Sequence, residues 1–252
     1  QTHGFAAGFD HVVAEDLMIG VAGLLADTTS EFARSPADEG DVRTYQAGAY
    51  ASWGDADFYV NANATAIWNE FDTRRRIQTG PATFVFADGD YGGLGGTAFL
   101  EMGTVIENEG LRLQPLASIF FLSHTTEAFT ETGAPTLNLS VEESTTESLR
   151  TSLGARLSHP LKWGETRIVP EFRAAWRHEF LDVSQVSNVA FAHDPSIKMT
   201  IVGSETGRDS AVLGFGLSAS LGRDTVLYSD LDGAFNADKN SVQASIGLRH
   251  SW

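Results

Sequence analysis

The stretch Phe58-Tyr-Val-Asn-Ala-Asn-Ala-Thr-Ala-Ile-Trp68 decides the fold, because its side chains alternate between two kinds. Apolar residues occupy every even position from Phe58 to Trp68, and polar residues occupy most of the odd positions between them. A period of two indicates a β-strand with one apolar and one polar face. Phe58 and Trp68 lie about 33 Å apart along such a strand, or about 25 Å after a tilt near 40°, which is the height of the apolar band of a membrane barrel.

The same alternation recurs along the whole chain. Eleven segments carry it, at 2–11, 16–27, 41–53, 57–71, 94–107, 110–127, 147–161, 165–182, 207–221, 224–235 and 240–252. Tight turns at 13–15, 54–56, 108–109, 162–164 and 222–223 alternate with long polar stretches near 28–40, 72–93, 128–146 and 183–206. This rhythm predicts an all-β fold, a transmembrane up-and-down antiparallel barrel with tight turns at one end and long loops at the other.

Composition narrows the function classes. The 252 residues include 33 acidic and 17 basic side chains, for a net charge of -16, and no cysteine. Nucleic acid is excluded as a partner because the chain has no basic footprint. Thiol nucleophiles and zinc-thiolate sites are absent, and no run of 18 apolar residues predicts a transmembrane helix. We expect residues 1–252 to form a single barrel domain.

The polar faces of the strands carry charges at mid-strand. In a soluble barrel these side chains would face bulk water, whereas in a membrane barrel they must face the lumen, because a lipid-facing charge at the midplane costs about 2–4 kcal/mol. Strand length and loop asymmetry favour the membrane. The expected lumen-lining residues are Glu101, Arg112, Arg150, Arg156, Glu171, Arg173, Arg177, Glu179, Asp230 and Arg249.

Aromatic residues near the strand ends are a further sign of a membrane. Trp and Tyr concentrate at the two interfaces of a bilayer, where their rings are half apolar and half hydrated. The residues expected in these girdles are Tyr45, Trp53, Phe58, Trp68, Trp163, Trp176 and Trp252.

Strand direction bears on closure of the barrel. Counted alternately, segments 2–11 and 240–252 run the same way, so they cannot pair antiparallel with each other. Single-chain bacterial barrels have even strand numbers. We therefore expect a barrel of twelve strands, of which eleven are present here and the first lies upstream.

The stretch Ser245-Ile-Gly-Leu-Arg-His-Ser-Trp252 has a polar residue, a glycine two positions later and a final aromatic residue. It resembles the C-terminal β-signal that the barrel assembly machinery recognises in bacterial outer-membrane proteins. The expected signal residues are Ser245, Gly247, His250 and Trp252, and His250 departs from the aromatic or apolar residue usual at its position.

Together with Gly4–His11, Leu17–Gly23, Phe99–Gly103 and Pro170–His178, this signal makes the chain resemble the translocator β-domain of the monomeric autotransporters. The resemblance implies type V secretion, in which an outer-membrane barrel assists an N-terminal passenger to the cell surface. It implies a monomer without cofactor, whose first strand follows a helix threading the pore. Its partners would be the passenger, outer-membrane lipid with lipopolysaccharide, and the barrel assembly machinery.

Three rival interpretations stay open at this point. An outer-membrane hydrolase would use Ser123-His124, or one of the groups Asp10-His11, His178 with Glu179 and Asp182, and His193-Asp194. Catalysis requires nucleophile and base within about 3 Å, which spacing along the chain cannot show. A passive porin and an eleven-stranded soluble can are the other two. We expect no catalytic and no metal site, since the histidines are scattered and the acidic loops lack the spacing of a calcium loop.

Overall fold

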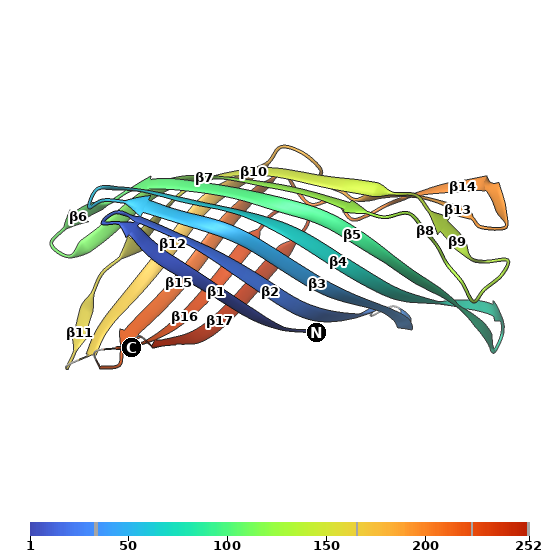
Figure 1. Cartoon of the computed structure of the whole chain (residues 1–252), viewed down its shortest axis with the longest axis horizontal. Coiled ribbons are helices and arrows are strands. Elements are labelled where there is room, and N and C mark those ends of the chain that lie inside the picture. Colours follow the sequence, from blue (N-terminus) through green and yellow to red (C-terminus); the bar gives the residue numbers. More distant parts are fainter. Residues whose placement is uncertain (33–34, 165, 223, 251–252) are drawn as a thin grey trace.

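The computed structural model describes residues 1–32, 35–164, 166–222 and 224–250, and Figure 1 shows them as one strongly curled antiparallel sheet. Eleven of its thirteen strands pair in sequence order. They are β1 (Thr2–Ala14), β2 (Leu17–Phe32), β3 (Ser35–Gly54), β4 (Phe58–Gly80), β5 (Thr83–Thr104), β7 (Leu111–Thr126), β10 (Ser144–Ser158), β12 (Thr166–Glu179), β15 (Asp209–Ser220), β16 (Thr225–Phe235) and β17 (Asn240–His250). The all-β antiparallel architecture is confirmed.

The apolar faces of the strands point outward. Leu153, Phe172 and Trp176 lie on one face of β10 and β12, and each side chain is about half exposed. In the described part of the chain the buried apolar residues are Ala87, Ala134 and Val189, which all lie beyond the curled part of the sheet. A soluble barrel would instead bury its apolar face inside. No helix in the described residues is long and apolar enough to cross a membrane.

The five tight turns all connect neighbouring strands at one end of the sheet, as expected. Two of the turns carry short extra strands, β6 (Ile106–Asn108) against β7 and β11 (Leu161–Trp163) against β12. Gly110 and Gly222 adopt φ values of 82° and 85° in two of these turns. Residues with a side chain rarely adopt this left-handed conformation, so glycine allows the chain to reverse within a few residues.

The opposite end differs from the expected loops. Residues 28–32, 35–40 and 72–93 continue the strands as two long hairpins, β2 with β3 and β4 with β5. One ion pair lies at the base of the first extension, where Arg43 is 3.1 Å from Asp27, and another lies within the second, where Arg74 is 2.8 Å from Asp88. Charged side chains opposite one another stabilise strand pairing even where no apolar face is present. The loop prediction, which rested on polar composition, was wrong for these two stretches.

The other two long connections, 128–146 and 183–206, form a second, four-stranded sheet in place of the expected loops. Its order is β14 (Asp194–Val202), β13 (Val186–Phe191), β9 (Leu139–Val141) and β8 (Phe129–Thr130). Figure 1 shows this sheet and the β4–β5 hairpin reaching beyond the curled sheet on the same side. The end opposite the tight turns is therefore built from paired strands.

β1 and β17 form the two edges of the curled sheet. Among the described residues β1 pairs only with β2, and β17 pairs only with β16. Each step along the order is antiparallel, so the first and last of eleven strands run in the same direction. The direction expected from the sequence is confirmed.

Candidate functional site on the inner face of the sheet

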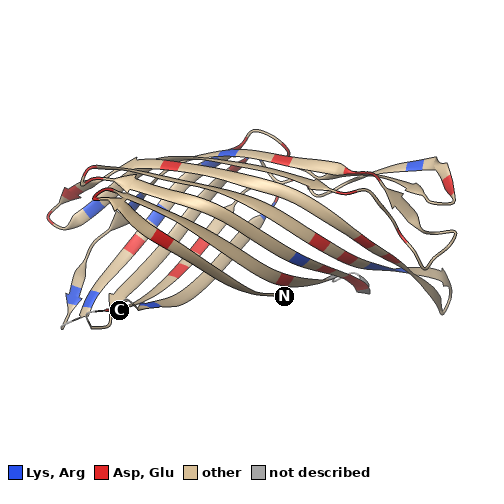
Figure 2. Cartoon of the chain, in the orientation of Figure 1, with Lys and Arg blue, Asp and Glu red and all other residues tan. Residues whose placement is uncertain are grey.

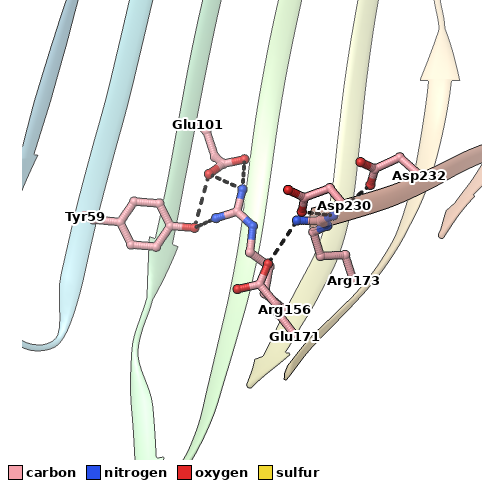
Figure 3. A network of polar contacts seen from close by, with 7 residues as sticks. All are labelled: Tyr59, Glu101, Arg156, Glu171, Arg173, Asp230 and Asp232. Atoms are coloured by element: carbon pink, nitrogen blue, oxygen red, sulfur yellow. Dashed lines mark hydrogen bonds and ion pairs between the residues drawn. The ribbon is translucent and has the colours of Figure 1, made fainter. Parts of the chain in front are cut away.

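The concave face of the sheet, here called the inner face, carries a network centred on Arg156 of β10. Arg156 Nη2 donates hydrogen bonds to Glu101 Oε1 and Oε2 of β5, at 2.8 and 2.9 Å. Its Nη1 lies 3.1 Å from the Tyr59 hydroxyl of β4, which in turn lies 3.3 Å from Glu101 Oε1. These contacts pass over β7 and join strands up to three positions apart in the sheet, which is possible where curvature makes the side chains converge (Figure 3).

A second network surrounds Arg173 of β12. Arg173 Nη2 donates to Asp230 Oδ1 at 2.8 Å and to Asp232 Oδ1 at 3.1 Å, both on β16, and Nη1 donates to Glu171 Oε1 at 3.2 Å. The strand between them, β15, has Gly214 opposite both Arg173 and Asp232. A Cβ atom at Gly214 would lie 2.6 Å from Arg173 Nε, so glycine leaves the space through which the arginine crosses β15.

Glu179 is the last residue of β12, at the end of the sheet opposite the tight turns. Its carboxylate accepts hydrogen bonds from Ser148 Oγ at 2.6 Å and from the backbone amides of Leu149 and Leu181 at 2.9 and 3.1 Å. Arg150 of β10 lies opposite Glu179, with 3.8 Å between Nε and Oε2. The Arg150 guanidinium stacks over the Phe120 ring, 4.4 Å from its centroid.

The remaining charged residues expected in the lumen occupy the same face by strand register. Arg177 lies opposite Ser152 of β10, Arg112 opposite Ser158 of β10, and Arg249 opposite Val226 of β16. Arg112, Arg177 and Arg249 make no ion pair with the described residues. Figure 2 shows charges of both signs spread over the strands of the curled sheet.

Sequence reasoning missed three residues of these networks. Tyr59, Asp232 and Gly214 were not singled out. Tyr59 lies on the polar face of the deciding stretch, and Asp232 follows Asp230 at the spacing of two that keeps a side chain on the same face. Alternation could therefore have found both. No sequence pattern marks Gly214, because its role depends on which strand lies beside β12.

The aromatic residues form two groups near opposite ends of the strands. Tyr45 pairs with Trp68 on the side of the long hairpins, and Trp53 packs against Phe58 near a tight turn, with 6.1 Å between ring centroids. The Trp53 indole donates to Asp16 Oδ2 at 2.7 Å, and the Trp176 indole donates to Asp209 Oδ1 at 2.8 Å. Trp163 is 79 % exposed beside another tight turn, and Trp252 lies outside the described residues.

The residues expected to form the assembly signal lie along the edge strand β17. Ser245 pairs with Asp230, Gly247 with Tyr228 and His250 with Thr225 of β16. The ring of Tyr228 fills the space that a Cβ atom at Gly247 would need, so only glycine fits there without displacing the ring. Trp252 of this signal falls outside the part of the chain that the structure describes.

The catalytic candidates do not assemble into a reactive group. Ser123 and His124 are consecutive residues of β7 and therefore point to opposite faces. His124 Nε2 lies 2.9 Å from Asn69 Nδ2, and the His178 ring lies 2.9 Å from Asp209 Oδ1 beside the Trp176 indole. The described residues hold no group of three or more histidine and acidic side chains arranged to bind a metal ion.

An outward apolar face, aromatic residues at both strand ends and a charged inner face define an outer-membrane barrel. The family model "Autotransporter beta-domain" matches residues 1–232. The chain therefore belongs to the autotransporter β-domain family, whose members are translocator barrels of the bacterial outer membrane.

Relatives and solved structures agree with this assignment. The chain is 23% identical to an "Extracellular serine protease" of Serratia marcescens over 99% of its own length. It is 28% identical to "Outer membrane protein A" of Rickettsia conorii over 71% of its length. It spans 24% and 9% of those two proteins.

Two solved structures share the fold. The translocator domain of the autotransporter NalP from Neisseria meningitidis matches 99% of this chain and 80% of its own, with a TM-score of 0.75 and 14% identity. The beta domain of the Bordetella autotransporter BrkA matches 100% of this chain and 91% of its own, with a TM-score of 0.65 and 22% identity.

Proposed function

We propose that this barrel secretes a passenger attached to its N-terminal side, and that the inner face supplies a hydrated path for it. The observation that carries the proposal is the segregation of the two faces. Ion-paired Glu101, Arg156 and Arg173 lie on the concave side, and half-exposed apolar side chains such as Leu153 lie on the convex side. Charges that are paired yet still in contact with water favour the passage of a polar, extended chain.

We propose that the expected lumen-lining set keeps this path open by holding its charges against the wall of the barrel. Arg156 and Arg173 each bind carboxylates of other strands, so their side chains cannot swing freely across the lumen. Removing one partner of such a pair leaves an uncompensated charge, which is costly where water is scarce. The inner face therefore acts as scaffold and as lining, without a catalytic step of its own.

Closure of the barrel follows from the direction of its edge strands. Because β1 and β17 run parallel, one further strand placed between them would pair antiparallel with both. We propose that this strand lies upstream of residue 1 in the protein as made, giving the twelve strands of a closed single-chain barrel.

Further partners are proposed on the same basis. The convex apolar face would contact outer-membrane lipid. Next to Tyr45 and Trp68, on the side of the long hairpins, it would also contact lipopolysaccharide. The edge strand β17 with Gly247 would be the part that the barrel assembly machinery recognises. The barrel would work as a monomer, since one added strand removes both open edges.

The test is secretion by the full-length protein in its own upstream context. A reporter placed in the upstream region should become accessible to added protease on intact cells when the barrel is folded in the outer membrane. The matched control is the same protein with Gly247→Glu, which should leave the reporter inside because β17 cannot pack under Tyr228. A heat-modifiable, membrane-inserted wild-type barrel whose reporter stays protected in the periplasm would overturn the proposal.

A further inference from the structure

Arg150 and Arg177 differ from the two other arginines on the inner face of β10 and β12. Arg156 and Arg173 donate to carboxylates at 2.8 to 3.2 Å. The Arg177 side chain makes no hydrogen bond or ion pair with the residues that the structure describes. Arg150 Nε is buried without a hydrogen-bond partner, and its nearest carboxylate oxygen is 3.8 Å away.

The Glu179 carboxylate lies 3.8 Å from Arg150 and can balance only one of the two positive charges. Glu179 already accepts hydrogen bonds from the Ser148 hydroxyl and from the backbone amides of Leu149 and Leu181. Glu179 thus bonds neither guanidinium at hydrogen-bond distance, and no carboxylate of the described residues forms an ion pair with Arg177. The charge around Arg150 and Arg177 is therefore positive. The Arg173 network, by contrast, has three carboxylates around one arginine.

The space in front of Arg177 is preformed. Arg177 lines a cavity of about 220 Å³ together with Ser118 and Ser152. The ion pairs Glu101–Arg156 and Asp232–Arg173 also line this cavity, so Arg177 is the one arginine of its wall without an ion pair to a described carboxylate. Arg150 does not line this cavity, but it lies diagonal to Arg177 across the β10–β12 pair, and stacking on Phe120 holds its guanidinium in place. A fixed guanidinium presents its N–H groups as a planar fork that matches the two oxygens of a carboxylate or phosphate. The serine hydroxyls at the cavity add uncharged donors for the same kind of ligand.

We propose that Arg150 and Arg177 form an oxyanion-binding site on the inner face of the barrel, which takes a carboxylate or a phosphate group. If the proposed secretion function holds, the natural source is an acidic side chain of the polypeptide inside the barrel, and a dissolved anion is the other source. Binding supplies an oxyanion at hydrogen-bond distance from Arg177, because the carboxylates Glu101 and Asp232 in the same cavity are bound to Arg156 and Arg173.

The experiment measures the reactivity of individual arginines in the folded barrel in detergent. Phenylglyoxal modifies arginine, and peptide mass spectrometry reads the rate at each site. Arg150 and Arg177 should react, and inorganic phosphate at about ten times its dissociation constant should slow both about tenfold. Two internal controls are Arg112, which is exposed and should react at the same rate with and without phosphate, and Arg156, which Glu101 should keep slow throughout.

Unchanged reactivity of Arg177 in phosphate, or equal protection of Arg112, would overturn the proposal. If a tetra-aspartate peptide protects Arg177 at a lower carboxylate concentration than acetate does, the natural ligand is a polypeptide side chain. If phosphate protects Arg177 better than the peptide does, the natural ligand is a dissolved anion. The variant Arg177→Gln should abolish the protection of Arg150. Loss of reporter display by the wild-type barrel would contradict the secretion function alone, since labelling of Arg177 does not depend on a passenger.

Discussion

Arg173 of β12 reaches Asp232 of β16 by crossing over the intervening strand β15, with 3.1 Å between Nη2 and Oδ1. The crossing is possible because β15 has Gly214 where every other residue would place a Cβ atom against the guanidinium. A contact between strands that are not neighbours ties three strands together. It therefore resists sliding of β12, β15 and β16 past one another.

Gly214→Ala should destabilise the barrel by about 1–3 kcal/mol, the usual cost of adding a methyl group where no space exists. The free energy of unfolding in urea, measured on barrels refolded into lipid vesicles, gives this difference. Gly23→Ala is the matched control, because the nearest atom to its added Cβ is the Gln46 carbonyl oxygen at 3.6 Å. Equal stabilities of the two variants would contradict the role of Gly214.

Glu101→Gln and Arg156→Gln should each destabilise the barrel, and the double variant should lose less than the sum. Glu101 is nearly buried and Arg156 about a third exposed, with two hydrogen bonds between them. Since water reaches part of this pair, the coupling free energy should be about 1–2 kcal/mol, below that of a fully desolvated pair. Additive losses in a double-mutant cycle of urea unfolding would show that the contact contributes nothing.

Arginine substitutions at neighbouring positions of β4 test which face meets lipid. Ala64 lies on the apolar face of the deciding stretch and Asn63 on the polar face. Ala64→Arg near the centre of the apolar band should cost about 2–4 kcal/mol when folding is measured in vesicles, and Asn63→Arg should cost well under half of that. The reverse order would mean that the membrane contacts the other face.

Acid should weaken the tight turn between β3 and β4. The Asp55 carboxylate accepts hydrogen bonds from the backbone amides of Asp57 and Phe58, both at 2.8 Å, and these bonds hold its pKa below the usual value of 3.8. A lowered pKa contributes stability that is fully present above the unfolded value and lost as pH falls through the folded one.

Asp55→Ala should therefore lower the thermal unfolding temperature at pH 7, and its deficit relative to wild type should shrink below pH 4. Asp55→Asn is the control, because an amide oxygen accepts the same hydrogen bonds without titrating. A deficit of Asp55→Ala that is equal at pH 7 and pH 3 would contradict this assignment.

The sequence predicted the curled sheet well because membrane strands obey one strict rule of alternation over many residues. In the stretch from Phe58 to Trp68 each side chain faces either lipid or water, so apolar and polar residues alternate with a clear period of two. The number of strands, the tight turns and the parallel direction of the two edge strands followed from counting. The outer hairpins escaped prediction, since water solvates both of their faces and polar composition alone is typical of loops as well as of paired strands.

The partners within the site could not be predicted from alternation. The sequence placed Glu101, Arg156 and Arg173 on one face, but not the reach of Arg156 across β7 to Tyr59. That contact depends on strand register and on sheet curvature, which bring together residues 97 positions apart in the chain. The space over Gly214 likewise exists only once β15 lies between β12 and β16.

The length of β4 has one more consequence. From Trp68 to Gly80 the strand continues for about 40 Å along its axis, or about 30 Å along the membrane normal at a tilt near 40°. If Trp68 marks the outer boundary of the apolar band, the tip at residues 81–82 stands clear of the lipid headgroups, on a stalk stiffened by pairing with β5. Such a tip is the natural place for a label or an affinity tag.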